Sequence, residues 1–190
     1  MSDIITVNGE QFELYIPEEK IRLRVKDLAV QINKDYAGKV PIFIGVLNGS
    51  FIFFSDLIRE IKVECEVDFL KLSSYGDAKI SSGNVTMLKD LNCPVPGRDI
   101  IVVEDVVDSG LSIDFIKRLI MRQNPKSFRV VTLLYKTDAA KIDFPIDYVG
   151  FEIPSEFVIG YGLDFAQKVR NLKSIYRLLA SEPEAHTPPA

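Results

Sequence analysis

The sequence predicts an α/β fold in which a central parallel β-sheet is flanked by helices. Short apolar runs rich in β-branched residues, such as residues 42–46 and 100–103, alternate with stretches in which apolar residues recur at helical spacing. An apolar run without polar alternation is typical of a strand covered on both faces, as in a parallel sheet. Because 47% of the 190 residues are hydrophobic, the chain can build one substantial core, and we expect a single domain over residues 1–180.

The first half of the chain predicts two helices and two buried strands before a long polar loop. Pro17 precedes the first helix, in which apolar residues recur at helical spacing until Gly38. The next elements are expected in the order strand, turn, helix and strand, over residues 40–47, 48–50, 51–61 and 67–72. Residues 73–90 are polar and contain glycine, which predicts a hairpin that is either a mobile active-site lid or a plain surface loop.

The most informative stretch is residues 100–113, IIVVEDVVDSGLSI. Its apolar start predicts a buried strand, and Glu104 and Asp105 follow at the carboxyl end, where ligands bind in open α/β sheets. Small residues then lead into a helix expected from about Ile113 to Asn124. The free N–H groups and positive dipole at a helix N-terminus hold phosphate without needing lysine or arginine. The pattern therefore predicts a site for a phosphorylated sugar.

Each polar residue of this stretch has a candidate role. Glu104 and Asp105 match a vicinal diol, since carboxylates accept hydrogen bonds from sugar hydroxyls, and they could also support a divalent cation. Asp108 remains free for acid or base chemistry. The alternative is that the serines only cap a helix and that the acids lie on a solvated loop. The residues expected to hold the phosphate are Ser109, Gly110, Leu111 and Ser112.

Several other kinds of site are excluded by the sequence. It contains no G-x-x-x-x-G-K-[ST] phosphate loop and no G-x-G-x-x-G after the first strand. The single histidine, His186, lies in the proline-rich residues 181–190, which we expect to be a disordered tail. Cys65 and Cys93 are isolated, which argues against a zinc site or a disulfide framework. Carboxylates, lysine, tyrosine and backbone dipoles are left to carry a reaction, and this set favours oxygen-ligated Mg²⁺.

Charge and hydropathy exclude broader classes. The chain has 23 basic and 27 acidic residues, a formal charge of −4, so we expect no general affinity for nucleic acid or for an anionic membrane. No segment approaches the roughly 20 apolar residues of a membrane span. The first residues lack the basic and apolar regions of a signal peptide, and a cytoplasmic location is expected.

Two further strands are expected, over residues 128–135 and 147–153. The first delivers Lys136 to its carboxyl end, where a lysine is either a solvated charge or a ligand contact. Phe157 follows the second strand, and the pattern alone favours a place for it in the core.

The stretch EDVVDSG closely resembles the phosphoribosyl pyrophosphate motif of type I phosphoribosyltransferases, most of all their hypoxanthine-guanine branch. Four further segments match in the family's order, and the resemblance extends over nearly the whole chain. They are residues 47–50 (the pyrophosphate loop), 74–76 (the mobile active-site loop), Lys136 (the purine-contacting lysine), and 157–164 with Arg170 (the base- and metal-binding segment).

The resemblance implies a small hood over the carboxyl edge of the sheet, built from terminal segments that include about residues 153–175. It also implies a homodimer or homotetramer. The implied reaction is Mg²⁺-dependent: hypoxanthine or guanine reacts with phosphoribosyl pyrophosphate to give IMP or GMP and pyrophosphate. In relatives the backbone of the pyrophosphate loop binds pyrophosphate, often through a cis peptide.

The resemblance also assigns roles to single residues. Asp108 would accept or share the proton on the five-membered ring of the purine, and Lys136 would donate a hydrogen bond to its 6-oxo group. Phe157 would stack on the base, and Val158 would offer backbone groups to the base edge. The remaining assignments are Asn48, Gly49 and Arg170 for pyrophosphate, Ser74 and Tyr75 for the mobile loop, and Glu104, Asp105 and Asp164 for the metal.

The chain departs from the family pattern at a few positions, and two alternative functions stay open. Asn48 stands where some members have lysine, and Ser109 and Ser112 stand where many have threonine. One alternative is a nonenzymatic regulator that uses the same fold to sense the sugar donor or a nucleotide. The other is a transferase for a pyrimidine or adenine, against which Lys136 together with Phe157 argues. The preference among hypoxanthine, guanine and xanthine is left open.

Overall fold

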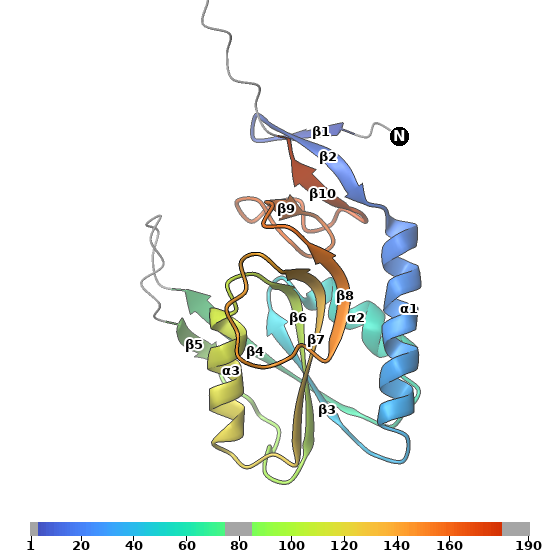
Figure 1. The fold of residues 1–190 in the computed structure, drawn as a ribbon, viewed down its shortest axis with the longest axis vertical. Helices are drawn as coiled ribbons and strands as arrows, with labels where there is room; N and C mark the ends of the chain where they lie inside the picture. The colour runs from blue at the N-terminus through green and yellow to red at the C-terminus, as the bar shows by residue number, and fades with distance from the viewer. Residues whose placement is uncertain (1–3, 75–84, 180–190) are drawn as a thin grey trace, which may run out of the picture.

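The computed structural model describes residues 4–74 and 85–179, which form two sheets and three helices (Figure 1). The larger sheet has six strands in the order β5-β4-β3-β6-β7-β8, and only β5 runs antiparallel to its neighbour. Its strands are β3 (Ile42–Leu47), β4 (Glu66–Ser74), β5 (Val85–Lys89), β6 (Asp99–Val107), β7 (Ser127–Lys136) and β8 (Tyr148–Ile153). The expected, mainly parallel α/β sheet is confirmed.

Strand β6 is longer than the sequence predicts. We expected it to end at Val103, but its pairing with β7 continues through Val106 and Val107, which lie opposite Leu134 and Tyr135. The two valines keep the strand extended because they favour β structure and can pair with apolar partners. Glu104 and Asp105 therefore lie within β6, in the part that runs beside β7, rather than beyond the end of the strand.

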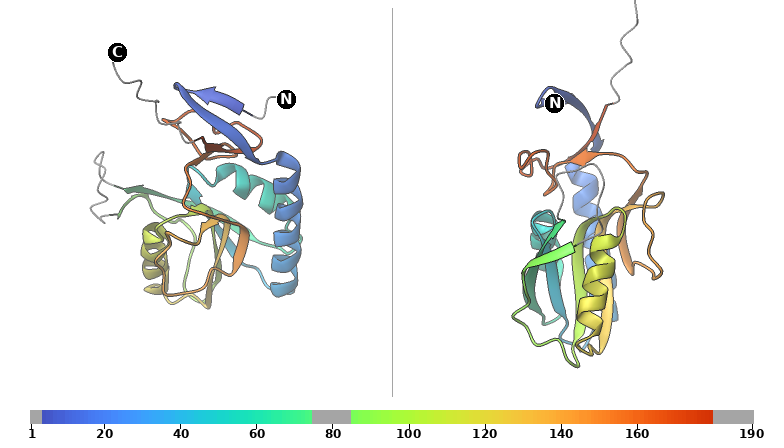
Figure 2. Two further views of the ribbon diagram at one scale, coloured as in Figure 1. Left: turned by 45° about the horizontal axis from the view of Figure 1, so that its top comes forward. Right: turned by 90° about the vertical axis from the view of Figure 1, so that its left-hand side faces the viewer.

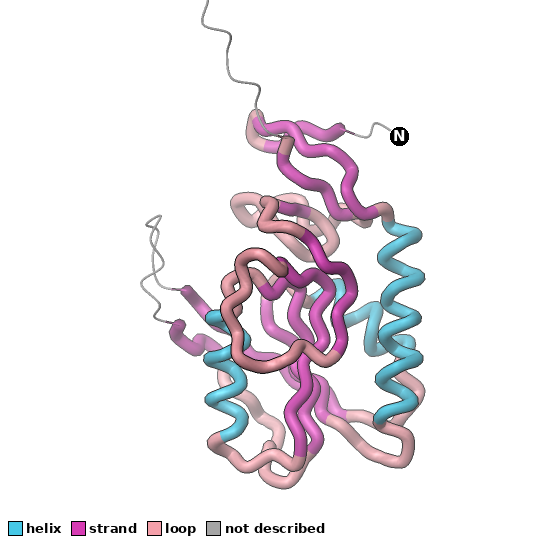
Figure 3. Tube along the Cα trace, in the orientation of Figure 1, coloured by secondary structure: helices cyan, strands magenta, loops and turns pink. Residues whose placement is uncertain are grey.

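The helices cover both faces of this sheet (Figure 3). Helices α1 (Glu18–Asp35) and α2 (Phe51–Glu60) pack on the face that carries Ile101 and Val103. Helix α3 (Leu111–Met121) packs on the opposite face, with Ile100 and Val102. Successive residues of β6 alternate between these two cores because strand side chains have a period of two. The layer arrangement explains why the central strands are apolar without alternation.

The first two helices lie close to their expected positions. Helix α1 follows Pro17 and ends before Gly38, which has a positive φ of 73°. Helix α2 buries Phe53, Phe54 and Leu57. None of the helices in the described residues combines the length and apolarity that a bilayer span requires.

The second sheet joins the two ends of the chain. It has the strand order β1-β2-β10-β9, all antiparallel, and it lies beyond the end of the central sheet (Figures 1 and 2). Its strands are β1 (Ile4–Val7), β2 (Glu10–Ile16), β9 (Val158–Ile159) and β10 (Ile175–Leu178). This sheet is the counterpart of the hood that the family resemblance implies.

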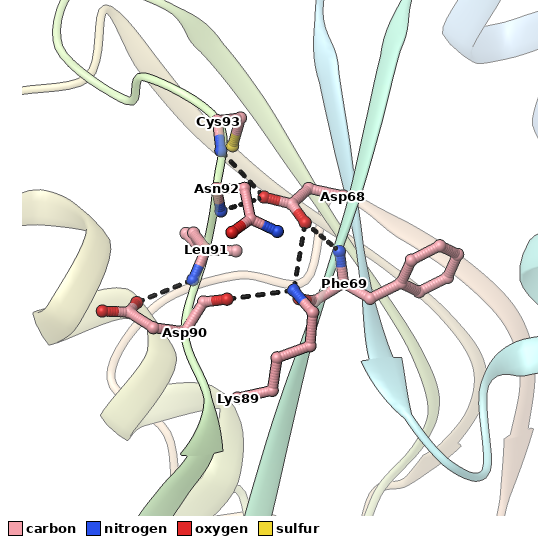
Figure 4. Close-up of polar contacts among 7 residues, drawn as sticks. All are labelled: Asp68, Phe69, Lys89, Asp90, Leu91, Asn92 and Cys93. Atoms are coloured by element: carbon pink, nitrogen blue, oxygen red, sulfur yellow. Dashed lines mark hydrogen bonds and ion pairs between the residues drawn. The ribbon is translucent and has the colours of Figure 1, made fainter.

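A buried carboxylate fixes the chain where it leaves β5. Asp68 of β4 accepts hydrogen bonds from the backbone N–H groups of Phe69, Asn92 and Cys93, at 2.7, 2.6 and 2.9 Å, and from Lys89 Nζ at 3.3 Å (Figure 4). Burial raises the pKa of Asp68, but these hydrogen bonds outweigh it and lower the pKa to about 2. The ionised carboxylate thus ties residues 89–93 to the middle of β4.

The base of the expected hairpin is present, because β4 and β5 pair antiparallel up to Ser74 and Val85. Tyr75 of the expected mobile loop and residues 181–190 of the expected tail lie outside the described residues. Cys65 and Cys93 are both free thiols and partly buried.

Candidate active site

The carboxyl end of β6 opens into a pocket of about 250 Å³. Glu104 and Asp105 line it from the strand, and Asp108, Ser109 and Gly110 continue around it. Ser112 and Ile113 close the pocket at the start of α3. The stretch that the sequence singles out therefore surrounds one cavity.

The loop into α3 requires a glycine at its last position. Gly110 has a positive φ of 85°, and a Cβ there would collide with the side chain of Ile142. Ser109 Oγ accepts a 3.5 Å hydrogen bond from the N–H of Leu111. The N-cap residue of α3 is Gly110, which has no side chain to cap the helix. The positive end of α3, with the N–H groups of its first turn, faces the pocket that Ser112 lines. This is the geometry expected for a phosphate.

The two carboxylates of β6 differ in surroundings. Glu104 is 7% exposed, and burial and the neighbouring Asp105 raise its pKa well above the usual value. Among the described residues its Oε2 atom is buried without a hydrogen-bond partner. Burial also raises the pKa of Asp105, to about 6, although its own backbone N–H and that of Val106 oppose this rise. A buried acceptor without a donor is costly, so Glu104 is suited to a ligand that brings a hydroxyl group or a cation.

Asp108 and Lys136 form an ion pair at the ends of β6 and β7. Lys136 Nζ lies 2.7 Å from Asp108 Oδ2. Lys136 is 8% exposed, whereas more than half of the Asp108 side chain is exposed. Lys136 is the last residue of β7, and its contact with a ligand remains a prediction. The pairing itself was not predicted, because 28 residues separate the two positions and no local pattern links them.

The loop after β3 reaches the same place from the other face of the sheet. The peptide bond between Leu47 and Asn48 is cis. A Cβ on Gly49 would collide with the carboxylate of Asp105. Gly162, with a φ of 101°, lies against Gly49 in turn, since a Cβ there would collide with the carbonyl oxygen of Gly49. Three segments distant in sequence thus meet at Asp105.

Asp164 and Arg170 lie at the edge of this meeting point. Arg170 binds Asp164 Oδ1 at 2.6 Å and donates to the carbonyl oxygen of Gly162 at 2.8 Å. The charge of Arg170 lowers the pKa of Asp105 and that of Asp164 raises it, which places both charges near that carboxylate. In this structure the Arg170 guanidinium fixes the turn after Gly162. A contact with pyrophosphate remains a prediction.

Phe157 and Val158 lie in the hood. Phe157 is 47% exposed, whereas Val158 is buried in β9 and pairs with Arg177 of β10. Two further rings, those of Phe12 and Phe165, contact Phe157. The sequence did not indicate either of them, because a single phenylalanine carries no signal beyond burial.

The described residues do not form a metal site by themselves. Among them, no three His, Cys, Asp or Glu side chains gather as a metal centre would require. Ser74 is the last residue of β4. A larger cavity of about 390 Å³, between α1, α2 and residues 171–173, contains none of the expected site residues.

Comparison with known proteins identifies a family for most of the chain. Residues 16–166 match the family model of the phosphoribosyl transferase domain. The chain is 44% identical over 163 residues to the hypoxanthine-guanine phosphoribosyltransferase of Bacillus subtilis, covering 86% of this chain and 91% of the relative. It is 40% identical over 169 residues to the hypoxanthine phosphoribosyltransferase of Escherichia coli, covering 88% and 95%. A crystal structure of a hypoxanthine-guanine phosphoribosyltransferase from Bacillus anthracis matches with a TM-score of 0.83 and 44% identity, over 88% of this chain and 98% of that chain.

Proposed function

This chain belongs to the phosphoribosyltransferase family, and on that premise we propose that it transfers the phosphoribosyl group of phosphoribosyl pyrophosphate to hypoxanthine or guanine. The products are IMP or GMP and pyrophosphate, so the protein is a purine salvage enzyme. The observation that carries this proposal is the ion pair of Asp108 and Lys136, which lies beside the loop that leads into α3 and lines the pocket proposed for phosphate.

The Asp108–Lys136 pair complements one edge of a 6-oxopurine. The 6-oxo oxygen and N7 lie side by side on that edge. Lys136 offers only hydrogen-bond donors and an ionised Asp108 offers only acceptors. A purine whose N7 carries the proton could therefore place its 6-oxo oxygen at Lys136 and its N7–H at Asp108, replacing their mutual contact of 2.7 Å. Adenine has an amino group at position 6, which would set a donor against Lys136.

The sugar donor would occupy the pocket at the end of β6. Its 5-phosphate would meet the first turn of α3 and the Ser109 and Ser112 hydroxyls, while Gly110 and Leu111 offer their N–H groups. Its two ring hydroxyls would donate to Glu104 and Asp105, which gives a donor to Glu104 Oε2, an atom that has no partner among the described residues.

The leaving pyrophosphate would lie between the turn after β3 and the segment that follows β9. Gly49 keeps the loop backbone close to Asp105, and Asn48 contributes no positive charge, so backbone groups would make most of the contacts. Arg170 lies close enough to Asp105 to influence its pKa and would turn part of its guanidinium toward the anion.

The residues present fit Mg²⁺, which requires oxygen ligands. Glu104 and Asp105 are neighbouring carboxylates, and the charge of Asp164 is near enough to raise the pKa of Asp105. The elevated pKa of Asp105, about 6, is typical of a group that a cation would stabilise. Because the carboxylates do not form a cluster of three, the cation would complete its shell with substrate oxygens and water. When bound, Mg²⁺ would neutralise negative charge on the departing pyrophosphate.

In the reaction, the residues of the chain hold and orient both substrates. As the bond from the sugar carbon to pyrophosphate breaks, that carbon develops positive character, and N9 of the purine forms the new bond to it. Asp108 accepts or shares the N7 proton, and Lys136 stabilises the developing charge on the 6-oxo oxygen. Ser74 ends β4, and whether Tyr75 and its neighbours close over the site lies outside the described residues.

A base panel tests the proposal. Hypoxanthine, guanine, xanthine, adenine and uracil are each incubated with phosphoribosyl pyrophosphate with and without Mg²⁺, and nucleotide and pyrophosphate are measured together. We expect turnover of hypoxanthine or guanine, with equal amounts of the two products, only with Mg²⁺. No turnover with any base despite measurable donor binding would contradict the proposal.

Assembly and location belong to the same proposal. A homodimer or homotetramer and a cytoplasmic location rest on the family resemblance, and sedimentation analysis and cell fractionation test them. We expect no binding to nucleic acid or to anionic membranes, since a net charge of −4 gives no general attraction to either.

A further inference from the structure

Three phenylalanine rings from distant parts of the chain meet in the hood. Phe157 lies 5.6 Å from Phe165 and 6.2 Å from Phe12, between ring centroids. Phe12 and Phe165 complete the triangle at 5.8 Å. These spacings are within the range in which aromatic rings attract one another beyond simple burial. We call Phe12, Phe157 and Phe165 the aromatic triad.

Only one ring of the aromatic triad has a large exposed surface. Phe12, in β2, is fully buried, whereas Phe157 is 47% exposed. Phe165 approaches Phe157 at an interplanar angle of 73°, an edge-on contact. Two neighbours thus restrict the Phe157 ring while part of it stays open to a ligand.

The backbone of Phe157 is held by the same sheet. Its carbonyl oxygen accepts a 2.9 Å hydrogen bond from the N–H of Leu178, and Leu178 lies opposite Phe12 in the pairing of β10 with β2. Strand β2 therefore supports Phe157 twice, through β10 and through the Phe12 ring. Fixing a side chain before binding lowers the entropy that binding must remove.

Phe165 has a second connection, to the pyrophosphate side of the site. It directly follows Asp164, whose carboxylate binds Arg170 at 2.6 Å. Its backbone also forms a closed turn with Lys168, through hydrogen bonds of 3.2 and 3.1 Å. Phe165 thus belongs to the hydrogen-bonded turn that follows Asp164, and its side chain contacts the ring proposed to stack on the base.

We propose that Phe165 and Phe12 are positioning residues that hold the Phe157 ring in the orientation in which it stacks on the 6-oxopurine. This inference rests on the proposed function, because it requires Phe157 to be the base platform. It assigns purine affinity in part to Phe12, a residue near the opposite end of the chain.

The test is steady-state kinetics on the full chain with Phe165→Leu, Phe165→Tyr and Phe12→Leu. Phe165→Leu is expected to raise the KM for the 6-oxopurine about 3- to 10-fold, because an aromatic contact of this kind is lost. The KM for phosphoribosyl pyrophosphate should change by less than about twofold. Phe165→Tyr keeps the ring and should restore the purine KM. Phe12→Leu should shift the purine KM in the same direction as Phe165→Leu.

Phe69→Leu is the matched control. Phe69 pairs with Phe54 at 4.8 Å in the main core, so the variant also loses one ring contact, but away from the hood. It should leave both KM values unchanged. The inference is overturned if Phe165→Leu leaves the purine KM unchanged, raises both KM values equally, or behaves like Phe69→Leu. Because Phe165 is only partly buried, this variant should fold even if Phe12→Leu does not. Absence of transfer by the unaltered chain would instead contradict the proposed function.

Discussion

Replacing Asp68 by asparagine should destabilise the fold by removing a charge while keeping the side-chain shape. The pKa of Asp68 is lowered from 3.8 to about 2 in the folded chain. A difference of this size corresponds to roughly 2 kcal/mol of stability when the carboxylate is ionised. A hydrogen bond to a charged group contributes about 1.5–3 kcal/mol, and Asp68 accepts several, so the magnitude is reasonable.

Urea unfolding at neutral pH measures this loss. With a denaturant slope of about 2 kcal/mol per molar urea, Asp68→Asn should lower the midpoint by about 1 M. Asp90→Asn is the matched control, since Asp90 is exposed and its carboxylate accepts a hydrogen bond only from its neighbour Leu91 in this network (Figure 4). The control should change the unfolding free energy by less than about 0.5 kcal/mol.

The pH dependence gives a second test of the same reasoning. Because the folded pKa of Asp68 is depressed, its contribution is fully present above the usual value of 3.8 and is lost as the pH falls toward about 2. The unaltered chain should therefore lose more stability than Asp68→Asn as the pH falls below about 4. Equal pH slopes for the two proteins, or a midpoint shift no larger than that of Asp90→Asn, would refute the argument.

Three further predictions concern the site. Asp108→Ala should lower kcat by about 10²–10⁴-fold and leave sugar-donor binding largely intact. Steady-state assays measure kcat, and titration calorimetry measures donor binding. Unchanged turnover would show that Asp108 is not the base. Lys136→Ala should raise the KM for 6-oxopurines by about tenfold or more, and an equal loss of donor affinity would count against a direct base contact. Gly49→Ala should weaken donor binding, because its Cβ would collide with Asp105, and titration calorimetry that finds normal affinity would show that this close approach is dispensable.

The sequence predicted the sheet and the main loop because both depend on local patterns. Apolar runs at residues 42–46 and 100–103 became β3 and β6, and the acidic and small residues after the second run line one pocket. The prediction that β6 ends at Val103 was wrong by four residues. Its last residues are extended because β7 provides partners for Val106 and Val107, and a partner strand is not visible in a local pattern.

Contacts between distant residues could not be predicted. The ion pair of Asp108 with Lys136 depends on the register of β6 beside β7. The contact of Phe12 with Phe157 depends on β2 and β10 pairing across the whole chain. Such pairs arise from tertiary packing, which the spacing of residues along one segment does not encode. The family resemblance supplied the candidate roles, but not these neighbours.

The order of the central strands has a consequence for how new specificity could arise. Strands β3 and β6 are adjacent and parallel, but the chain leaves β3 toward α2 on one face and leaves β6 toward α3 on the other. Their connections diverge at a topological switch point, and this divergence opens a crevice whatever side chains the two loops carry. The crevice therefore follows from the strand order and the connections between strands. Exchanging residues 48–50 or 108–112 should change which ligand binds while the sheet remains intact.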